Sequence, residues 1–291
     1  MNRFNLELKK IEDKLIIIFS QNHIEDFLLL DAMRYSTLNG GKRLRPLLTL
    51  ASGKLSMANE NILIDVGCAI ELMHCYSLIH DDLPAMDNAD MRRSVLTCHK
   101  KYNEAIGILA GDALQSLAFE LLSADSILLN PVTKLKIIEL IAKSIGYNGM
   151  AGGQAIDLIA TGVKLDLEAI KKMHALKTGA LIKAAILSGY LCGDKFDFEV
   201  YTNLSKIADN IGLLFQIKDD ILDVTKDTAT LGKIANKDII NDKSTYVSTI
   251  GIEPSFELAT NIFNDIINKL NDFNNSDDLI ELTNSIYNRN N

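Results

Sequence analysis

Apolar residues recur at three- and four-residue spacing along most of this 291-residue chain, and this period constrains its fold more than any other feature. The pattern is clear in "AIGILAGDALQSLAFELLSA", "TKLKIIELIAKSIG" and "YTNLSKIADNIGLLFQIKDDILDV". Strand signals are scarce, because no long run alternates apolar and polar residues and no Asn-Gly or Asp-Gly turn joins candidate strands. The chain also has only four prolines. The sequence therefore predicts an all-α protein.

Several of these segments are apolar on more than one face, as expected for helices surrounded by other helices. Breaks fall at Asn39-Gly40-Gly41, Gly152-Gly153, Gly193-Asp194 and Gly251, but no linker, repeat or low-complexity stretch separates two halves. We predict that residues 1–291 form a single domain, a bundle of about ten or more helices. We expect weaker definition after about residue 255, where asparagine is frequent.

The amino-acid composition limits the partners and the cellular location that are expected for this protein. The formal net charge of −8 argues against nucleic acid or an anionic membrane surface as a partner, so an anionic ligand needs local cations or metal. The four cysteines form no CxxC pair, which favours reduced thiols and a cytoplasmic location. No stretch approaches about 18 uninterrupted apolar residues, so no membrane span is expected.

Two clusters of aspartates stand out, and the second is the simpler. In "QIKDDILDV", Asp219 and Asp223 are four residues apart and share a helix face, with Asp220 beside them and Gln216 one turn earlier. Stacked carboxylates repel one another unless a cation lies between them, and hard oxygen ligands suit magnesium. The alternative is a solvated acidic face, but the apolar residues around the aspartates make a free surface helix a poor match.

The first cluster, "HDDLPAMD", contains Asp81, Asp82 and Asp87 around a helix-breaking Pro84. In an unbroken helix, Asp81 and Asp87 would point about 120° apart. If two residues bulge out at the proline, the carboxylates converge; alternatively, the helix simply ends at Leu83. Two such clusters on separate helices could hold several magnesium ions across a cavity and bind a diphosphate.

Several short motifs of this sequence resemble those of a known protein family. From "GGKRLRP" at residue 40 to "KSTY" at residue 243, six blocks occur in the order typical of one family. The middle four are "LIHDDLPAMD", "GGQAIDL", "HALKTGALI" and "FQIKDDILD". The chain resembles the short-chain trans-polyprenyl diphosphate synthases, specifically the bacterial farnesyl diphosphate synthase type.

The resemblance implies a head-to-tail prenyltransferase with the isoprenoid synthase fold, in which helices surround a central active-site cavity. Such an enzyme condenses isopentenyl diphosphate with dimethylallyl and geranyl diphosphate to give mainly farnesyl diphosphate. It also implies Mg²⁺ as cofactor, three ions with Mn²⁺ able to substitute, and a homodimer.

The resemblance also assigns site residues by position. The catalytic set is Asp81, Asp82, Asp87, Lys177, Asp219 and Asp220, and the metal ligands are these five aspartates with Asp223. The allylic diphosphate would contact Arg92, Lys177, Thr178, Gln216, Lys233 and Lys243. The isopentenyl diphosphate would contact Lys42, Arg45, His74 and Arg93.

Product length is implied by Tyr76, five residues before Asp81, together with Ser77. A bulky residue at position 76 accompanies fifteen-carbon products in similar enzymes, and a small one accompanies twenty. We expect His80 to be a core or hydrogen-bonding histidine. One departure is that Ser94 and Leu96 stand where the family pattern RRGxPT has glycine and proline, which changes the turn chemistry.

Three alternatives remain beside this interpretation. A geranylgeranyl diphosphate synthase of the same family differs only in product length. A class I terpene cyclase would carry an Asn/Ser/Glu triad in place of "DDILD" and would not use a second diphosphate site. A regulatory subunit of a larger synthase usually lacks one aspartate cluster, whereas both are present here.

Overall fold

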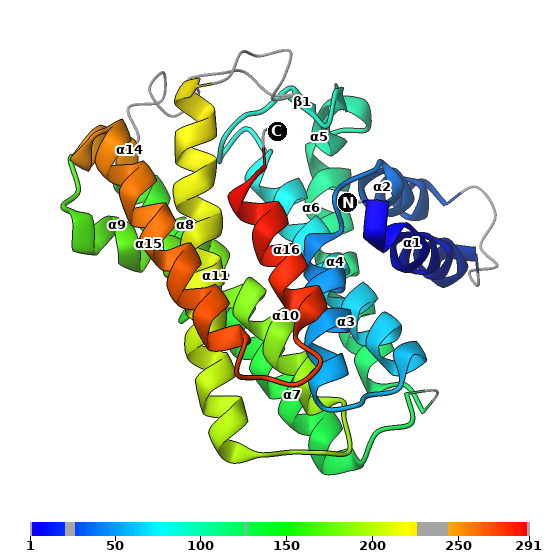
Figure 1. Cartoon of the computed structure of the whole chain (residues 1–291). Coiled ribbons are helices and arrows are strands. Elements are labelled where there is room, and N and C mark those ends of the chain that lie inside the picture. Colours follow the sequence, from blue (N-terminus) through cyan, green and yellow to red (C-terminus); the bar gives the residue numbers. More distant parts are fainter. Residues whose placement is uncertain (1, 21–26, 126, 226–243, 290–291) are drawn as a thin grey trace.

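The computed structural model describes residues 2–20, 27–125, 127–225 and 244–289 (Figure 1). Within these ranges the chain forms more than ten α-helices, and β-structure is limited to one two-stranded hairpin. The prediction of an all-α fold is therefore confirmed. The 3₁₀ and α-helices of the first half are η1 (Asn2–Phe4), α1 (Asn5–Ser20), α2 (Leu28–Leu38), α3 (Leu44–Leu55), α4 (Glu60–Asp81), α5 (Cys98–Lys101) and α6 (Glu104–Ser123). The second half contains α7 (Pro131–Ile145), α8 (Met150–Ile159), α9 (Leu167–His174), the π-helical segment η2 (Ala175–Gly179), α10 (Ala180–Leu191), α11 (Phe198–Thr225), α14 (Tyr246–Ile250), α15 (Ile252–Leu270) and α16 (Asp277–Tyr287).

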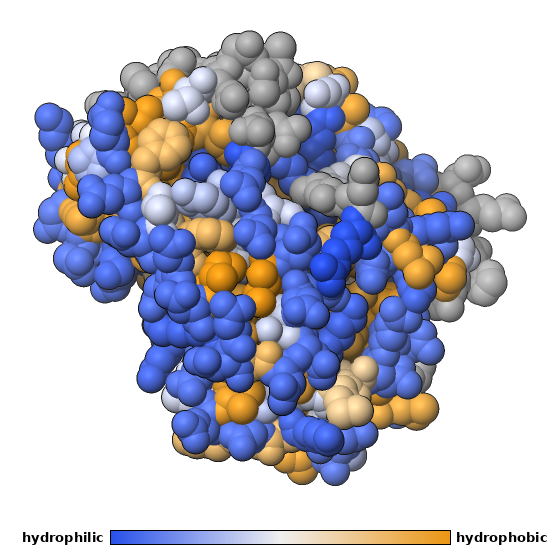
Figure 2. All heavy atoms as spheres, viewed as in Figure 1, coloured by the Kyte–Doolittle hydropathy of each residue, from blue (hydrophilic) through white to orange (hydrophobic). Residues whose placement is uncertain are grey.

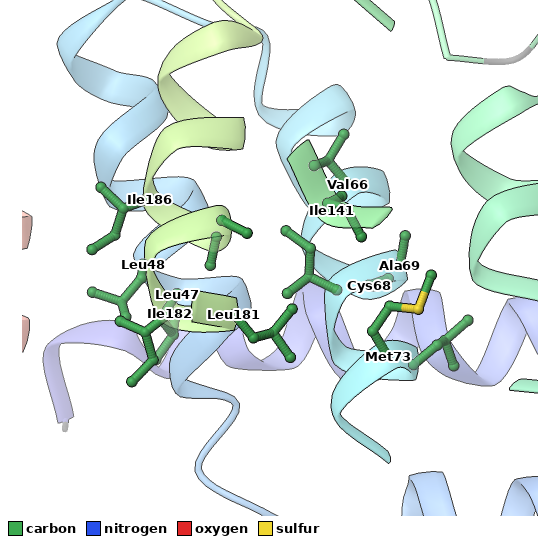
Figure 3. Close-up of a cluster of buried hydrophobic side chains, with 14 of the residues drawn as sticks. Leu47, Leu48, Val66, Cys68, Ala69, Met73, Ile141, Leu181, Ile182 and Ile186 are labelled. Atoms are coloured by element: carbon green, nitrogen blue, oxygen red, sulfur yellow. The ribbon is translucent and has the colours of Figure 1, made fainter. Parts of the chain in front are cut away.

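Helix α4 is the central element, and α3, α6 and α10 pack directly against it. Side chains from α3, α4, α7 and α10 meet in the cluster drawn in Figure 3, where Leu48, Val66, Ile141 and Leu181 are all buried. Burying such aliphatic side chains stabilises the fold by roughly 1.5–3 kcal/mol each. Because α4 is apolar all round, it can only be a core helix in this arrangement.

Two helices, α4 and α6, are long and apolar enough to cross a membrane by length and composition alone. Their burial differs: 78% of the apolar window of α4 lies inside the protein, but only 33% of that of α6. The apolar character of α4 is thus explained by packing. That of α6 is not, because Ile108 and Leu109 on this helix are about half exposed.

The C-terminal region is better ordered than the sequence suggested, so the expectation of weak definition after about residue 255 is wrong. Helix α15 packs along α11, and α16 packs against α3 and α15 (Figure 1, orange and red). Ile266, Leu270, Leu279 and Ile286 are buried by these contacts. Asparagines on the outer faces hid an apolar stripe with helical period. Figure 2 shows this side of the molecule covered mainly by hydrophilic side chains, with hydrophobic ones in smaller groups.

Candidate active site

The first aspartate cluster lies where α4 ends. Asp81 is the last helical residue, two residues before the end considered at Leu83, and Asp82 caps the helix. The N–H of Asp87 then donates to the carbonyl oxygen of Asp81 at 2.9 Å. In a continuous helix the residue four positions on would make that bond, so two extra residues loop out around Pro84 and the chain returns. The helix thus ends, and Asp87 nevertheless comes back to Asp81.

Arg92 is bound to this cluster. It lies in strand β1 (Met91–Arg92), which pairs with β2 (Val95–Leu96) across a tight turn. Its Nε and Nη2 donate to the two carboxylate oxygens of Asp82 at 2.8 and 2.7 Å, and Nη2 lies 4.0 Å from Asp81 Oδ2. Burial opposes the charged guanidinium, but the hydrogen bonds and charges of Asp82, with Asp81 and Asp87, outweigh it and raise the pKa of Arg92. Asp82 is therefore the buried anchor of Arg92, whereas Asp81 faces the cavity.

The second aspartate cluster occupies one face of α11. Asp220 is 2% exposed and accepts hydrogen bonds from Gln216 Nε2 and from the backbone N–H of Tyr246, both at 2.8 Å. Asp223 is also buried. Asp219 is the most open of the three, with a side chain 40% exposed and 3.5 Å from the guanidinium of Arg289. Asp219 is thus the aspartate of this helix best placed to meet a ligand.

Two helical segments connect the aspartate clusters. On α8, Gln154 Nε2 donates to Asp81 Oδ1 at 2.6 Å, and Asp157 accepts from Lys177 Nζ at 2.7 Å. Lys177 Nζ also lies 4.0 Å from Asp81 Oδ1, and Thr178 donates to Gln216 on α11 at 3.2 Å. These contacts join the expected allylic-site residues into one polar layer.

The sequence did not single out the roles of Gln154 and Asp157. Both lie in the block "GGQAIDL", three residues apart and hence on the same face of α8. That spacing was the available signal. The break expected at Gly152-Gly153 is wrong, because both glycines lie inside α8, where the absence of side chains lets the neighbouring backbone approach.

The position of Lys177 and Thr178 depends on local backbone geometry. Both lie in η2, a π-helical turn between α9 and α10, of the kind frequent at functional sites. Gly153 makes the approach of α8 possible, because a Cβ there would lie 2.2 Å from the backbone nitrogen of Lys177. A side chain at position 153 would therefore push α8 away from the site.

The residues expected to bind the second diphosphate gather beside the first cluster. His74 is surrounded by arginines: burial first, and then the charges of Arg45, Arg93 and Arg92, hold its pKa well below the ordinary value. Burial also lowers the pKa of Arg45. The charge of Glu71 partly opposes this decrease, and the charge of Arg93 adds to it. Arg45 Nε is buried without a hydrogen-bond partner among the described residues. This excess of positive charge is suited to an anion.

Lys42 is exposed and lies within electrostatic range of Asp219 on α11 and of Arg289. Its pKa is lowered by burial and by the charge of Arg289, while Asp219 raises it. The neighbouring Arg43, which the sequence did not single out, has a fully buried side chain bonded to Glu12, Glu71 and the carbonyl of Thr37. Arg43 thus ties the loop that carries Lys42 to α1, α2 and α4.

A cavity of about 340 Å³ lies between α4, α8 and η2, within the size range of small-molecule sites. Its polar lining includes Arg45, His74, Asp81, Gln154, Lys177 and Thr178. Its apolar lining includes Tyr76, Met86, Met150 and Leu158, with Ser77 beside Tyr76. The cavity can therefore receive a molecule with an anionic head and an apolar body. Lys233 and Lys243 lie outside the described residues.

The donor set fits magnesium that arrives with its ligand. No ready-made group of three metal-ligating side chains exists among the residues that the structure describes. Mg²⁺ usually needs only one or two protein carboxylates, because phosphate oxygens and waters complete its shell. Asp81 and Asp87 on one side, and Asp219 on the other, offer the required hard oxygen atoms.

A helical bundle that surrounds a half-polar cavity with two aspartate helices and an arginine cluster defines an enzyme class that handles diphosphate esters of apolar chains. Comparison with known proteins places the chain within that class. The family model "Polyprenyl synthetase" matches residues 26–286. The chain therefore belongs to the polyprenyl synthetase family.

Individual relatives agree with this assignment. The chain is 46% identical over 238 residues to farnesyl diphosphate synthase of Escherichia coli, covering 81% of this chain and 80% of that protein. It is 43% identical to geranylgeranyl pyrophosphate synthase 7 of Arabidopsis thaliana, covering 90% and 76% of the two chains. The structure of geranyltransferase from Helicobacter pylori, complexed with magnesium and isoprenyl diphosphate, matches with a TM-score of 0.88 and 32% identity, covering 99% and 98%.

Proposed function

We propose that this protein is a head-to-tail prenyltransferase that condenses isopentenyl diphosphate with dimethylallyl and geranyl diphosphate to give mainly farnesyl diphosphate. One observation carries the proposal: a single cavity is lined by Asp81 and Lys177 and also by Arg45 and His74, with an apolar wall between α4 and α8. Two anions and one growing hydrocarbon chain can meet there.

The allylic diphosphate would lie between the two aspartate helices. Bound Mg²⁺ would stabilise the negative charge that develops on the departing diphosphate. Asp81, Asp87 and Asp219 would hold it, while Asp82 holds Arg92 in place. Asp220 and Asp223, buried in α11, complete the acidic helix. Three Mg²⁺ ions would bind in this way, and Mn²⁺ would be able to replace them.

Several side chains of the protein would then contact the same diphosphate directly. Lys177 and Thr178 lie in this polar layer, and Gln216 links it to α11. Arg92 is held next to Asp81 by its hydrogen bonds to Asp82. Lys233 and Lys243, outside the described residues, belong to the proposed set by their position in the sequence. Charged donors placed in advance cost no reorganisation when negative charge develops.

The isopentenyl diphosphate would bind to Lys42, Arg45, His74 and Arg93. This diphosphate is retained in the product, so binding by guanidinium and ammonium groups serves it better than leaving-group activation by metal. A terpene cyclase has no use for this second site, and a regulatory subunit usually lacks one of the aspartate clusters. Both features therefore favour the synthase.

The growing chain would extend along α4 toward Tyr76. Tyr76 is 8% exposed and lines the cavity together with Ser77, so its ring can act as a floor for the hydrocarbon. A floor of this size favours farnesyl diphosphate over the longer geranylgeranyl diphosphate.

We further propose a homodimer that covers α6. Ile108 and Leu109 are 47% and 50% exposed on a helix whose apolar window is only one-third buried. Exposed apolar patches of this kind mark association surfaces. Light scattering at known concentration tests this: a monomer at micromolar concentration would contradict it.

We also propose that the whole chain forms one domain and that the protein is cytoplasmic. One hydrophobic cluster runs from Phe4 near the N-terminus to Ile286 in α16, which supports a single unit. All four cysteines are buried free thiols, which agrees with a reducing compartment.

Incubation of the purified protein with dimethylallyl and isopentenyl diphosphates tests the function. Phosphatase treatment and chromatography then identify the alcohol. Farnesol as main product is expected. A cyclic hydrocarbon, or no elongation of the allylic substrate in magnesium buffer, would overturn the proposal.

A further inference from the structure

We infer that His80 is a positioning residue for product length: its ring, fixed against α6, supports Tyr76 and keeps the cavity floor closed. The inference deepens the proposed function and rests on it. His80 lies beside the aspartate motif, but the chemistry described above does not use it.

The first observation is the contact between the two rings. His80 and Tyr76 are one helical turn apart on α4, so their side chains stack along the same face. Their ring centroids are 5.8 Å apart and the rings meet edge-on, an attractive geometry for aromatic pairs. Both residues line the 340 Å³ cavity. A chain that presses on Tyr76 therefore presses on His80 as well.

The second observation is that α6 holds both rings from behind. His80 Nε2 donates to the carbonyl oxygen of Ile108 at 3.0 Å. The ring lies directly over Gly111, where an added Cβ would be 2.1 Å from Nε2. One turn further along α6, Gln115 interacts with the side chain of Tyr76 and partly opposes the rise in its pKa that burial causes. The pair of rings is thus clamped at two successive turns of one helix.

These contacts explain how a tyrosine on the flank of α4 can resist a growing chain. A single aromatic ring can change rotamer when pushed, since staggered wells are separated by modest energies. Here the ring of His80 stands against one edge of Tyr76, and Gly111 of α6 lies directly behind His80, so His80 cannot move further toward α6 to make room for Tyr76. In a close-packed interior this fixes the floor.

The inference predicts opposite effects for two substitutions. Gly111→Ala pushes the His80 ring off α6 toward the cavity, so the ratio of geranyl to farnesyl product should rise by at least about fivefold. His80→Ala removes the support of Tyr76, so geranylgeranyl product should rise by a similar factor. His80→Phe keeps a ring against Tyr76 and should restore the parent distribution.

The decisive measurement is a double-mutant cycle on product length. In the His80→Ala background, Gly111→Ala should change nothing further, because the ring with which its methyl group collides is absent. Gly107→Ala is the matched control on α6: its Cβ would meet Leu83 at 3.2 Å and does not meet His80. It should leave the product distribution unchanged.

Thermal unfolding and total isopentenyl incorporation are measured for every variant, so folding and activity are known separately from product length. Unchanged lengths in both Gly111→Ala and His80→Ala would overturn the inference, as would an effect of Gly111→Ala that persists without His80. A folded His80→Ala protein that elongates nothing would make His80 part of the chemistry and would also overturn it. Failure of the parent protein to elongate would instead contradict the proposed function.

Discussion

Gln154 on α8 donates a 2.6 Å hydrogen bond to Asp81 at the end of α4, although the two residues are 73 positions apart. Lys177 stands 4.0 Å from the same carboxylate oxygen of Asp81. Asp81 is therefore oriented by a neutral donor and a cation before any ligand arrives. A carboxylate held in this way can bind a metal–diphosphate complex with little rearrangement.

The first prediction concerns metal. Activity should require Mg²⁺ or Mn²⁺, and Asp81→Ala or Asp219→Ala should each lower turnover by at least ~10²–10³-fold, because each removes stabilisation of the leaving group. Asp125→Ala, an exposed aspartate outside the site, is the control. Steady-state rates with and without chelator provide the test. Full activity in excess chelator would contradict the mechanism.

The second prediction separates the two diphosphates. Lys177→Ala should mainly impair use of the allylic substrate, and Arg45→Ala should mainly raise the KM for isopentenyl diphosphate, since each cation pairs with a different anion. Initial rates with each substrate varied in turn distinguish the effects. If both variants affected both substrates equally, the two sites would be wrongly assigned.

The third prediction concerns Tyr76. Tyr76→Ala should shift the product toward geranylgeranyl diphosphate, because losing the ring opens the floor; the cavity also costs some stability, roughly 3–5 kcal/mol if the site does not collapse. Chromatography of the released alcohols measures the shift, and Tyr190→Phe, at a buried tyrosine outside the cavity, is the control. An active variant that still stops at fifteen carbons would move the floor elsewhere, with the fully buried Met73 the next candidate.

The fourth prediction concerns pH. Burial and the nearby arginines hold the pKa of His74 well below 6.5, whereas the unfolded chain protonates this residue near 6.5. Below that pH the unfolded state binds the extra proton, so stability should fall by up to about 1.4 kcal/mol per pH unit. Urea unfolding from pH 7 to 5 should therefore be less pH-dependent in His74→Gln than in the parent. Identical slopes would contradict the prediction, because they would show that His74 binds its proton over the same pH range in the folded and unfolded states.

The fifth prediction concerns the hairpin that carries Arg92. Its turn residues Arg93 and Ser94 have φ of 52° and 64°, a left-handed conformation unfavourable for residues with a side chain. Ser94→Gly should relieve this strain and stabilise the protein by about 0.5–1 kcal/mol after the entropy cost of glycine. Ser94→Ala keeps the strain and should bring no gain. Chemical denaturation measures both; equal stabilities of the two variants would contradict the prediction.

Local sequence patterns predicted much of this structure. The three- and four-residue period predicted the helices because an amphipathic or buried helix must place apolar residues at that spacing. It failed after residue 255, where frequent asparagines concealed α15 and α16. The two aspartate clusters were also visible, since each lies within one short segment and its spacing can be converted directly into helix geometry.

The sequence by itself determined the helical class, the aspartate and basic motifs and the family. Only the tertiary structure decided which role each residue of those motifs has. Asp82 pairs with Arg92 while Asp81 faces the cavity, Gln154 reaches Asp81 from α8, and α6 clamps His80 against Tyr76. These outcomes depend on contacts between helices far apart in the chain, and the spacing of residues within one helix contains no information about which neighbouring helix will pack against it.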